Sequence, residues 1–129
     1  MEAKGKFKVI LSKEADDFLN KLESKIKNKV IYNIRKSTYF MDPELFKKLD
    51  DTDIWEFRTH YNKIQYRMLA FWDKNSDVDT LVIATHGFIK KTQKTPQKEI
   101  LKAEEIRKIY FNSKKQFLCL KSEKTDSTR

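Results

Sequence analysis

The chain has 129 residues, enough for one compact domain, and its 39% hydrophobic and 12% aromatic content excludes a disordered or fibrous protein. It contains 28 Lys and Arg against 19 Asp and Glu, a net charge of +9 that attracts polyanions such as nucleic acid, although a merely solvated basic surface is the alternative. With one cysteine, Cys119, and two histidines, neither a disulfide framework nor a zinc site is favoured, and we expect no metal and no cofactor.

The first part of the chain predicts a strand followed by two helices. Residues 7–11 are apolar and β-branched, as in a short strand, and Ser12 then offers an N-cap for a helix ending near residue 22. A second apolar stripe at helical spacing covers residues 24–40. Asp42-Pro43 ends this helix, because a residue before proline avoids the helical region. The two helices are expected to form a hairpin over a sheet.

The second part predicts three sequential strands and a last helix. Residues 54–60 alternate between apolar and polar, 64–72 form the next strand, and 80–89 form a mostly buried third strand, with polar turns at 61–63 and 75–79. Thr95-Pro96 marks the start of a helix that we expect to end near Phe111.

The predicted fold class is therefore α+β, in the order β-α-α-β-β-β-α. Short turns between sequential strands imply a small antiparallel sheet with the helical hairpin on one face. We expect a single domain over residues 1–111 and a partly disordered C-terminal extension over 112–129. The start, MEAKGKFKV, lacks a signal-peptide core, and no apolar run approaches the ~18 residues of a membrane span, so we expect a cytoplasmic protein.

The hairpin formed by 54–60 and 64–72 places two arginines together. If Asn62-Lys63 is a two-residue turn, Arg58 lies opposite Arg67, and Glu56 lies diagonal to Arg67 on the same face. Two arginines that face each other across a ladder repel, which suggests that an anion binds there. The alternatives are two solvated arginines on an open face, or a three-residue turn that would place Tyr66 opposite Arg58 instead.

A second basic feature is the segment from His86 to Lys98, which contains no acidic residue. It connects the end of a buried strand to the start of a helix, where backbone N–H groups and the helix dipole also favour anions. Phosphate binding by Lys90, Lys91, Lys94 and Lys98 is one interpretation, and an ordinary solvated loop is the other.

Three stretches of the sequence resemble a known family: IWEFR, YRMLAF and, most specifically, HGFIKKTQKTPQKEILKAEEIRKIY. They are similar to the phage-derived, HigB-like toxins of the RelE/ParE superfamily, over residues 7 to 111. The resemblance implies a RelE-like fold and the toxin of a type II toxin–antitoxin system. Many such toxins are metal-independent endoribonucleases, or mRNA interferases, that cut messages on the ribosome. A cognate antitoxin, which we expect to be of the helix-turn-helix type, holds each one inactive.

The resemblance also implies roles for individual residues. The expected catalytic set contains Arg58 and Arg67 as phosphate-binding groups, Lys90 and Lys91 as charge or proton donors, and Glu56 and His86 as proton carriers. Lys94, Lys98 and Tyr66 are expected to bind RNA. For His86 a buried structural role is equally compatible with the sequence, and Tyr66 fits the core better than a stacking site. A ParE-like toxin that acts on DNA gyrase, or an inactive co-repressor that only binds the antitoxin, are the alternative functions.

Overall fold

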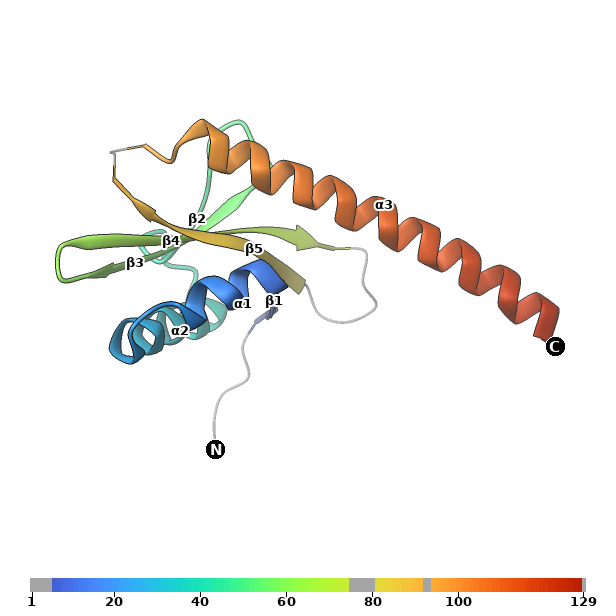
Figure 1. Ribbon diagram of the computed structural model, residues 1–129, viewed down its shortest axis with the longest axis horizontal. Coiled ribbons are helices and arrows are strands. Elements are labelled where there is room, and N and C mark those ends of the chain that lie inside the picture. The colour runs from blue at the N-terminus through green and yellow to red at the C-terminus, as the bar shows by residue number, and fades with distance from the viewer. Residues whose placement is uncertain (1–5, 75–80, 92–93, 129) are drawn as a thin grey trace.

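The fold is a mixed five-stranded sheet between two helices on one face and one long helix on the other (Figure 1). It is known from a computed structural model, which describes residues 6–74, 81–91 and 94–128, with the side chains of 81–83 and 114–128 outside the description. The elements in chain order are β1 (Lys8–Leu11), α1 (Lys13–Asn20), α2 (Ser24–Tyr39), β2 (Phe46–Lys48), β3 (Trp55–Tyr61), β4 (Ile64–Asp73), β5 (Leu81–Lys90) and α3 (Gln97–Thr128). The α+β class predicted from the sequence is confirmed.

The prediction of a purely antiparallel sheet is wrong at the β1 edge, and the opposite edge has a strand that was not predicted. The strand order is β1-β5-β4-β3-β2, and β1 runs parallel to β5, because α1, α2 and the other strands intervene and no hairpin fixes its direction. The second edge is β2, a strand absent from the prediction, which pairs antiparallel with β3. With only three residues, β2 is too short to show an alternating pattern in the sequence.

The central hairpin has the predicted turn and register. Asn62 and Lys63 both have positive φ, of 49° and 66°, as a two-residue turn between twisted strands requires. Arg58 consequently lies directly opposite Arg67. Trp55 and Phe57 contribute to the core on the side of the helical hairpin, also as predicted.

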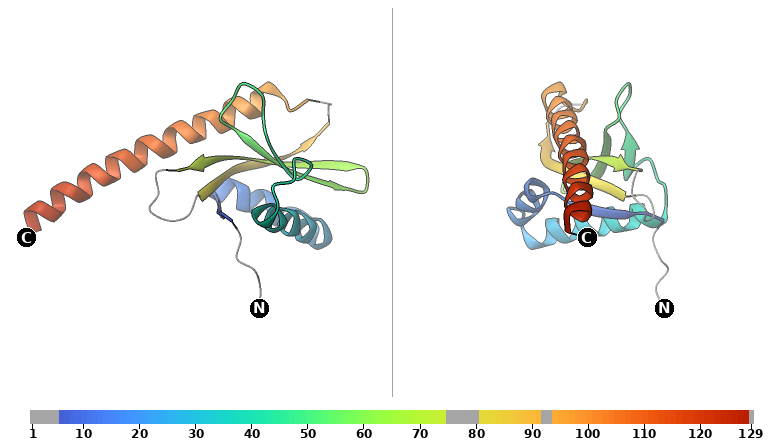
Figure 2. Two further views of the ribbon diagram at one scale, coloured as in Figure 1. Left: turned by 180° about the vertical axis from the view of Figure 1, so that it is seen from behind. Right: turned by 90° about the vertical axis from the view of Figure 1, so that its right-hand side faces the viewer.

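The two faces of the sheet are covered by different helices. The predicted helical hairpin is present as α1 and α2, and the side chain of Ser12 accepts a hydrogen bond from Ala15 N (3.1 Å), as expected of an N-cap. Figure 2 shows these helices on one face of the sheet and α3 on the other. The core under α1 and α2 is rich in aromatic rings, and a smaller core lies under α3.

The last helix is longer than predicted. It begins at Gln97 and continues to Thr128 instead of ending near Phe111, and it projects beyond the sheet (Figures 1 and 2). Asn112 has a low helix propensity, but one such residue costs only a few tenths of a kcal/mol and does not end a helix. The turn predicted at 75–79 lies outside the described residues.

Candidate functional site

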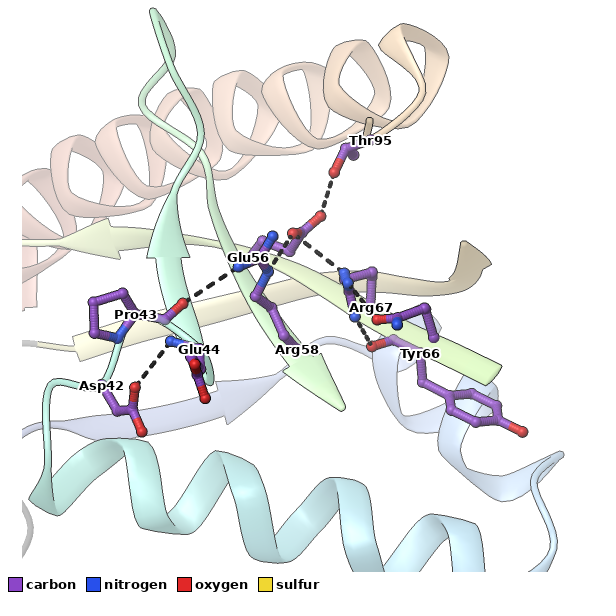
Figure 3. A network of polar contacts seen from close by, with 9 residues as sticks. Asp42, Pro43, Glu44, Glu56, Arg58, Tyr66, Arg67 and Thr95 are labelled. Atoms are coloured by element: carbon purple, nitrogen blue, oxygen red, sulfur yellow. Dashed lines mark hydrogen bonds and ion pairs between the residues drawn. The ribbon is translucent and has the colours of Figure 1, made fainter. Parts of the chain in front are cut away.

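The hairpin register brings Glu56, Arg58 and Arg67 into direct contact, as predicted. Arg58 Nε donates a hydrogen bond to Glu56 Oε1 at 3.2 Å, and Arg67 Nε lies 3.3 Å from the same oxygen (Figure 3). The carboxylate therefore lies between two guanidinium groups that would otherwise repel each other across the ladder. The two arginines form a binding site for an anion, and in this structure the carboxylate of Glu56 occupies it.

The prediction that these three residues share an open face is correct for the face and wrong for its openness. The side chain of Arg58 is 30% exposed, whereas Arg67 is 6% exposed and Glu56 only 1%. Burial lowers the pKa of Arg67, and the charge of Glu56 partly offsets this effect. An ion pair this deeply buried depends on both partners, because removing one leaves a charge without water or counter-charge.

Other polar groups fix the buried arginine in place. Arg67 Nη1 donates to the carbonyl of Tyr66 (3.2 Å), and Nη2 donates to Gln65 Oε1 (2.6 Å). The Nε–H group is close to Glu56 but does not point at it well enough to form a hydrogen bond, so this contact is electrostatic. Arg67 is therefore held by its own strand and by Glu56, and it has little freedom to reach outward.

Sequence reasoning missed two parts of the cluster. The hydroxyl of Thr95 donates a hydrogen bond to Glu56 Oε2, which ties the start of α3 to β3 (Figure 3). The sequence placed Thr95 at the start of the last helix, but that helix begins at Gln97 and the hydroxyl of Thr95 is bound to Glu56 instead. The second part is the carbonyl of Pro43, which accepts a long hydrogen bond (3.4 Å) from Arg58 Nη1. Both contacts join segments far apart in the chain, so no local pattern could reveal them.

The predicted lysines differ in their burial, and two of them, Lys90 and Lys94, line a pocket together with Glu56 and Arg58. Lys90 is half-buried at the end of β5, and burial lowers its pKa, with Arg67 and Arg58 adding to the effect and Glu56 opposing it. Lys91, which follows β5, is exposed. Lys94 and Lys98 are exposed near the start of α3.

His86 is separated from the arginine cluster. A bulge between Leu69 and Ala70 breaks the strict alternation, so His86 faces α3 while Ala84 belongs to the core on the opposite face. The imidazole is 3% exposed; its Nε2 lies 3.1 Å from Glu99 Oε1, and its Nδ1 lies 3.1 Å from the Thr85 hydroxyl. Burial lowers the pKa of His86, and the hydrogen bond with Glu99 partly offsets this. These contacts favour the structural interpretation of this histidine.

Tyr66 is also removed from the site. Its ring is 4% exposed and packs into the core on the face of α1 and α2, opposite to the arginine cluster. A base cannot stack on a ring that is covered by protein, so the stacking role expected from the sequence does not fit this structure. Burial in the core, the other interpretation, is the one that the structure supports.

Two grooves meet at Arg58. One, of about 470 Å³, lies between α2 and the β3–β4 hairpin and includes Lys29, Lys36, Arg58 and Arg67 in its lining. The other, of about 340 Å³, lies between β2 and the start of α3, where Lys48, Lys90 and Lys94 accompany Glu56 and Arg58. Both are lined mainly by cationic and polar groups, as suits an extended polyanion better than an apolar ligand.

Residues 6–74, 81–91 and 94–128 contain no group of three or more His, Cys, Asp or Glu side chains placed to hold a metal ion. Within the same residues, no helix combines the length and apolar character needed to cross a membrane.

Comparison with known proteins identifies the family. No curated protein matches the chain in sequence. The profile of the family described as "Phage derived protein Gp49-like (DUF891)" matches residues 17–108, which include α2, the whole sheet except β1, and the first part of α3. The Glu56, Arg58 and Arg67 cluster and the basic segment after β5 all lie inside the matched region. The chain therefore belongs to the Gp49-like family of phage-derived proteins.

Proposed function

We propose that this protein is the toxin of a type II toxin–antitoxin system, in the HigB-like branch of the RelE/ParE superfamily. In this proposal it cuts messenger RNA on the ribosome without a metal ion, and a helix-turn-helix antitoxin holds it inactive. Membership of the Gp49-like family and the resemblance of the HGFIKKTQKTP block support the system class. The observation that carries the activity is the cluster of Arg58, Arg67, Glu56 and Lys90 at the meeting point of two basic grooves.

The cluster offers the groups that metal-free RNA cleavage requires. In that reaction a base removes the proton of a 2′-hydroxyl, the 2′ oxygen attacks the neighbouring phosphorus, and the 5′ oxygen leaves with a proton from an acid. The products are a 2′,3′-cyclic phosphate and a free 5′-hydroxyl. Cations stabilise the negative charge that grows on the phosphate oxygens.

Arg58 is the side chain best placed to grip the phosphate. It is the more exposed of the two arginines, lines both grooves, and has a guanidinium group that can bind two phosphate oxygens at once. Arg67 is buried and acts on the phosphate through charge and through its hold on Glu56. We therefore assign the direct contact to Arg58 and a positioning role to Arg67.

Lys90 and Glu56 are the proton carriers in this proposal. A lysine with a lowered pKa gives up a proton more readily than an ordinary lysine, which suits Lys90 to protonate the leaving oxygen. Glu56 can accept the 2′-hydroxyl proton once Arg58 has turned from the carboxylate to the substrate phosphate, while Arg67 stays beside Glu56. His86 has no role here, because Glu99 and Thr85 hold it away from the cluster.

The test is cleavage of a message in a translating extract by protein purified with its antitoxin and then freed from it. Arg58→Ala should reduce cleavage by roughly ten- to a thousandfold, a loss of about 1.4–4 kcal/mol of transition-state stabilisation. Arg58→Lys should recover part of the activity. Arg35→Ala, which removes an equal charge from an exposed position on α2, should cut at the wild-type rate.

Full activity of Arg58→Ala would contradict the assigned role. A wild-type protein that cuts no message but inhibits DNA gyrase would replace the proposal with the ParE-like alternative. Binding of the antitoxin without any toxicity would favour the co-repressor. A small helix-turn-helix gene beside this one would support the toxin–antitoxin class independently of any activity.

A further inference from the structure

The groove between α2 and the β3–β4 hairpin, which we call the α2 groove, has features that the arginine cluster does not explain. Strand β2 pairs only with the first half of β3, from Trp55 to Phe57. The second half of β3 therefore borders the groove, where His60 joins Arg58 in its lining. The opposite wall is α2, and the volume of about 470 Å³ is in the range of sites that hold small organic groups.

The charges of the α2 groove favour an anion. Lys29 and Lys36 lie on the wall formed by α2, and Arg58 and Arg67 lie on the side of the hairpin. Among the described residues that line it, Glu44 is the one carboxylate. The groove is thus a basic channel that ends at the cluster to which the proposed function assigns the chemistry.

An exposed aromatic ring stands in the middle of the wall formed by α2. Tyr32 is three residues after Lys29 and four before Lys36, so all three side chains share one face of the helix. Tyr32 is 58% exposed, and Lys29 Nζ lies over the ring, 5.5 Å from its centroid. Flanked by lysines and left uncovered by the core, the ring has the surroundings of a stacking platform for a nucleobase.

We propose that the α2 groove binds single-stranded RNA next to the cleavage site. In this arrangement Tyr32 stacks on a base, Lys29 and Lys36 pair with phosphates, and the strand continues to Arg58. The inference rests on the proposed function, and it adds a binding site for the substrate outside the basic segment that the sequence had singled out. RNA fits this groove better than an acidic peptide does. An acidic peptide would need only the lysine and arginine charges, whereas a nucleobase can also stack on the exposed ring of Tyr32.

The experiment measures binding of a fluorescein-labelled six-nucleotide 2′-O-methyl oligouridylate by anisotropy, using the full chain. This probe lacks the 2′-hydroxyl nucleophile, so it is not consumed. Tyr32→Ala should weaken binding about tenfold, whereas Tyr32→Phe should keep the wild-type affinity, because stacking needs the ring and not its hydroxyl. Lys36→Ala should weaken binding and make the slope of log affinity against log salt shallower by about 0.7.

Arg35→Ala is the matched control, because Arg35 is next to Lys36 in α2 but lines a separate apolar pocket. It should leave the oligonucleotide affinity and the salt slope unchanged. Wild-type affinity in Tyr32→Ala, or equal losses in Lys36→Ala and Arg35→Ala, would overturn the inference. Hexaglutamate peptide, added as a competitor, would also overturn the inference if it bound as tightly as the oligonucleotide.

The two proposals can fail separately. If cleavage depends on Arg58 but oligonucleotide binding does not depend on Tyr32, the proposed role of the α2 groove is contradicted and the endoribonuclease proposal stands. Oligonucleotide binding that depends on Tyr32, in a protein that cuts no message, would keep the groove and remove the endoribonuclease.

Discussion

The face of the sheet under α1 and α2 is packed with apolar side chains, whereas the face toward α3 is apolar over one part and charged over the other. The first face contains a continuous cluster that includes Phe7, Phe46 and Phe57. On the second face Leu69 and Phe71 pack under α3, and the ion pairs of Glu56 lie beside them. Neighbouring residues of β3 and β4 contribute to both faces.

This difference shows how one hairpin serves two purposes. Successive side chains of a strand point to opposite faces, so Phe57 joins the apolar core while Glu56 and Arg58, its neighbours, form the charged cluster. Removal of apolar surface from water stabilises the first face. The second face holds buried charges, which contribute little net stability but define a site for an anion. A change in the apolar core should therefore alter stability alone, whereas a change in the ion pairs should alter both stability and chemistry.

Arg67→Ala is the substitution expected to lower the free energy of unfolding most, although Arg67 belongs to the charged cluster and not to the apolar core. Without Arg67, the carboxylate of Glu56 remains buried beside a single arginine, so the free energy of unfolding should fall by roughly 3–5 kcal/mol. The repulsion between Arg58 and Arg67 that the sequence indicates would alone predict the opposite effect. Urea unfolding followed by circular dichroism measures the loss.

The control for Arg67→Ala is the double variant Glu56→Gln, Arg67→Ala, which removes both charges of the pair. It should be less destabilised than the sum of its two single variants, because the two losses share one interaction. Additive losses would show that the ion pair is not the cause.

A smaller effect is expected on the opposite face, at Gly87. A Cβ at this position would lie 2.2 Å from Cδ2 of Phe18, so Gly87→Ala forces the ring of Phe18 to move. Overpacking of this kind costs about 1–3 kcal/mol of unfolding free energy. Cleavage per folded molecule should stay at the wild-type level, because Gly87 faces α1 and not the arginine cluster. Adding Phe18→Leu should restore part of the stability, and an unrescued double variant would contradict the steric explanation.

The features that could be predicted from the sequence are those with a local cause. The turn at Asn62-Lys63 fixes the register of β3 and β4, and the register places Arg58 opposite Arg67. Likewise Ser12 predicts the start of α1, because its side chain accepts a hydrogen bond from Ala15 N, only three residues away. Alternation along β3 was enough to separate its core residues from its charged ones.

The features that could not be predicted depend on contacts between distant segments. The parallel pairing of β1 with β5 and the hydrogen bond from Thr95 to Glu56 both join segments far apart in the chain. The burial of Glu56 also involves a distant segment, because Thr95, which lies just before α3, donates a hydrogen bond to it. A pattern in one strand shows which face a residue occupies, but not how far that face is covered.

The smallest expected effect concerns His86, on the face of the sheet toward α3. This histidine is buried beside Glu99 and close to the charges of Lys102 and Glu14. Burial favours the neutral imidazole, so the pKa of His86 in the folded chain lies below its ordinary value of 6.5. Protons then bind the unfolded chain more tightly. The stability that His86 contributes is complete above about pH 6.5 and is lost as the pH falls through the lower, folded-state pKa.

The loss at His86 cannot exceed about 1.4 kcal/mol for each pH unit. It is measured as the difference in unfolding free energy between the wild type and His86→Gln from pH 7.5 to 5, which cancels the contribution of the carboxylates that both proteins share. His60→Gln, at the exposed histidine, is the control and should follow the wild type. Parallel curves for His86→Gln and the wild type would contradict the assignment. A difference that grows as the pH rises would mean instead that Glu99 keeps the imidazole protonated, and that its charge outweighs burial.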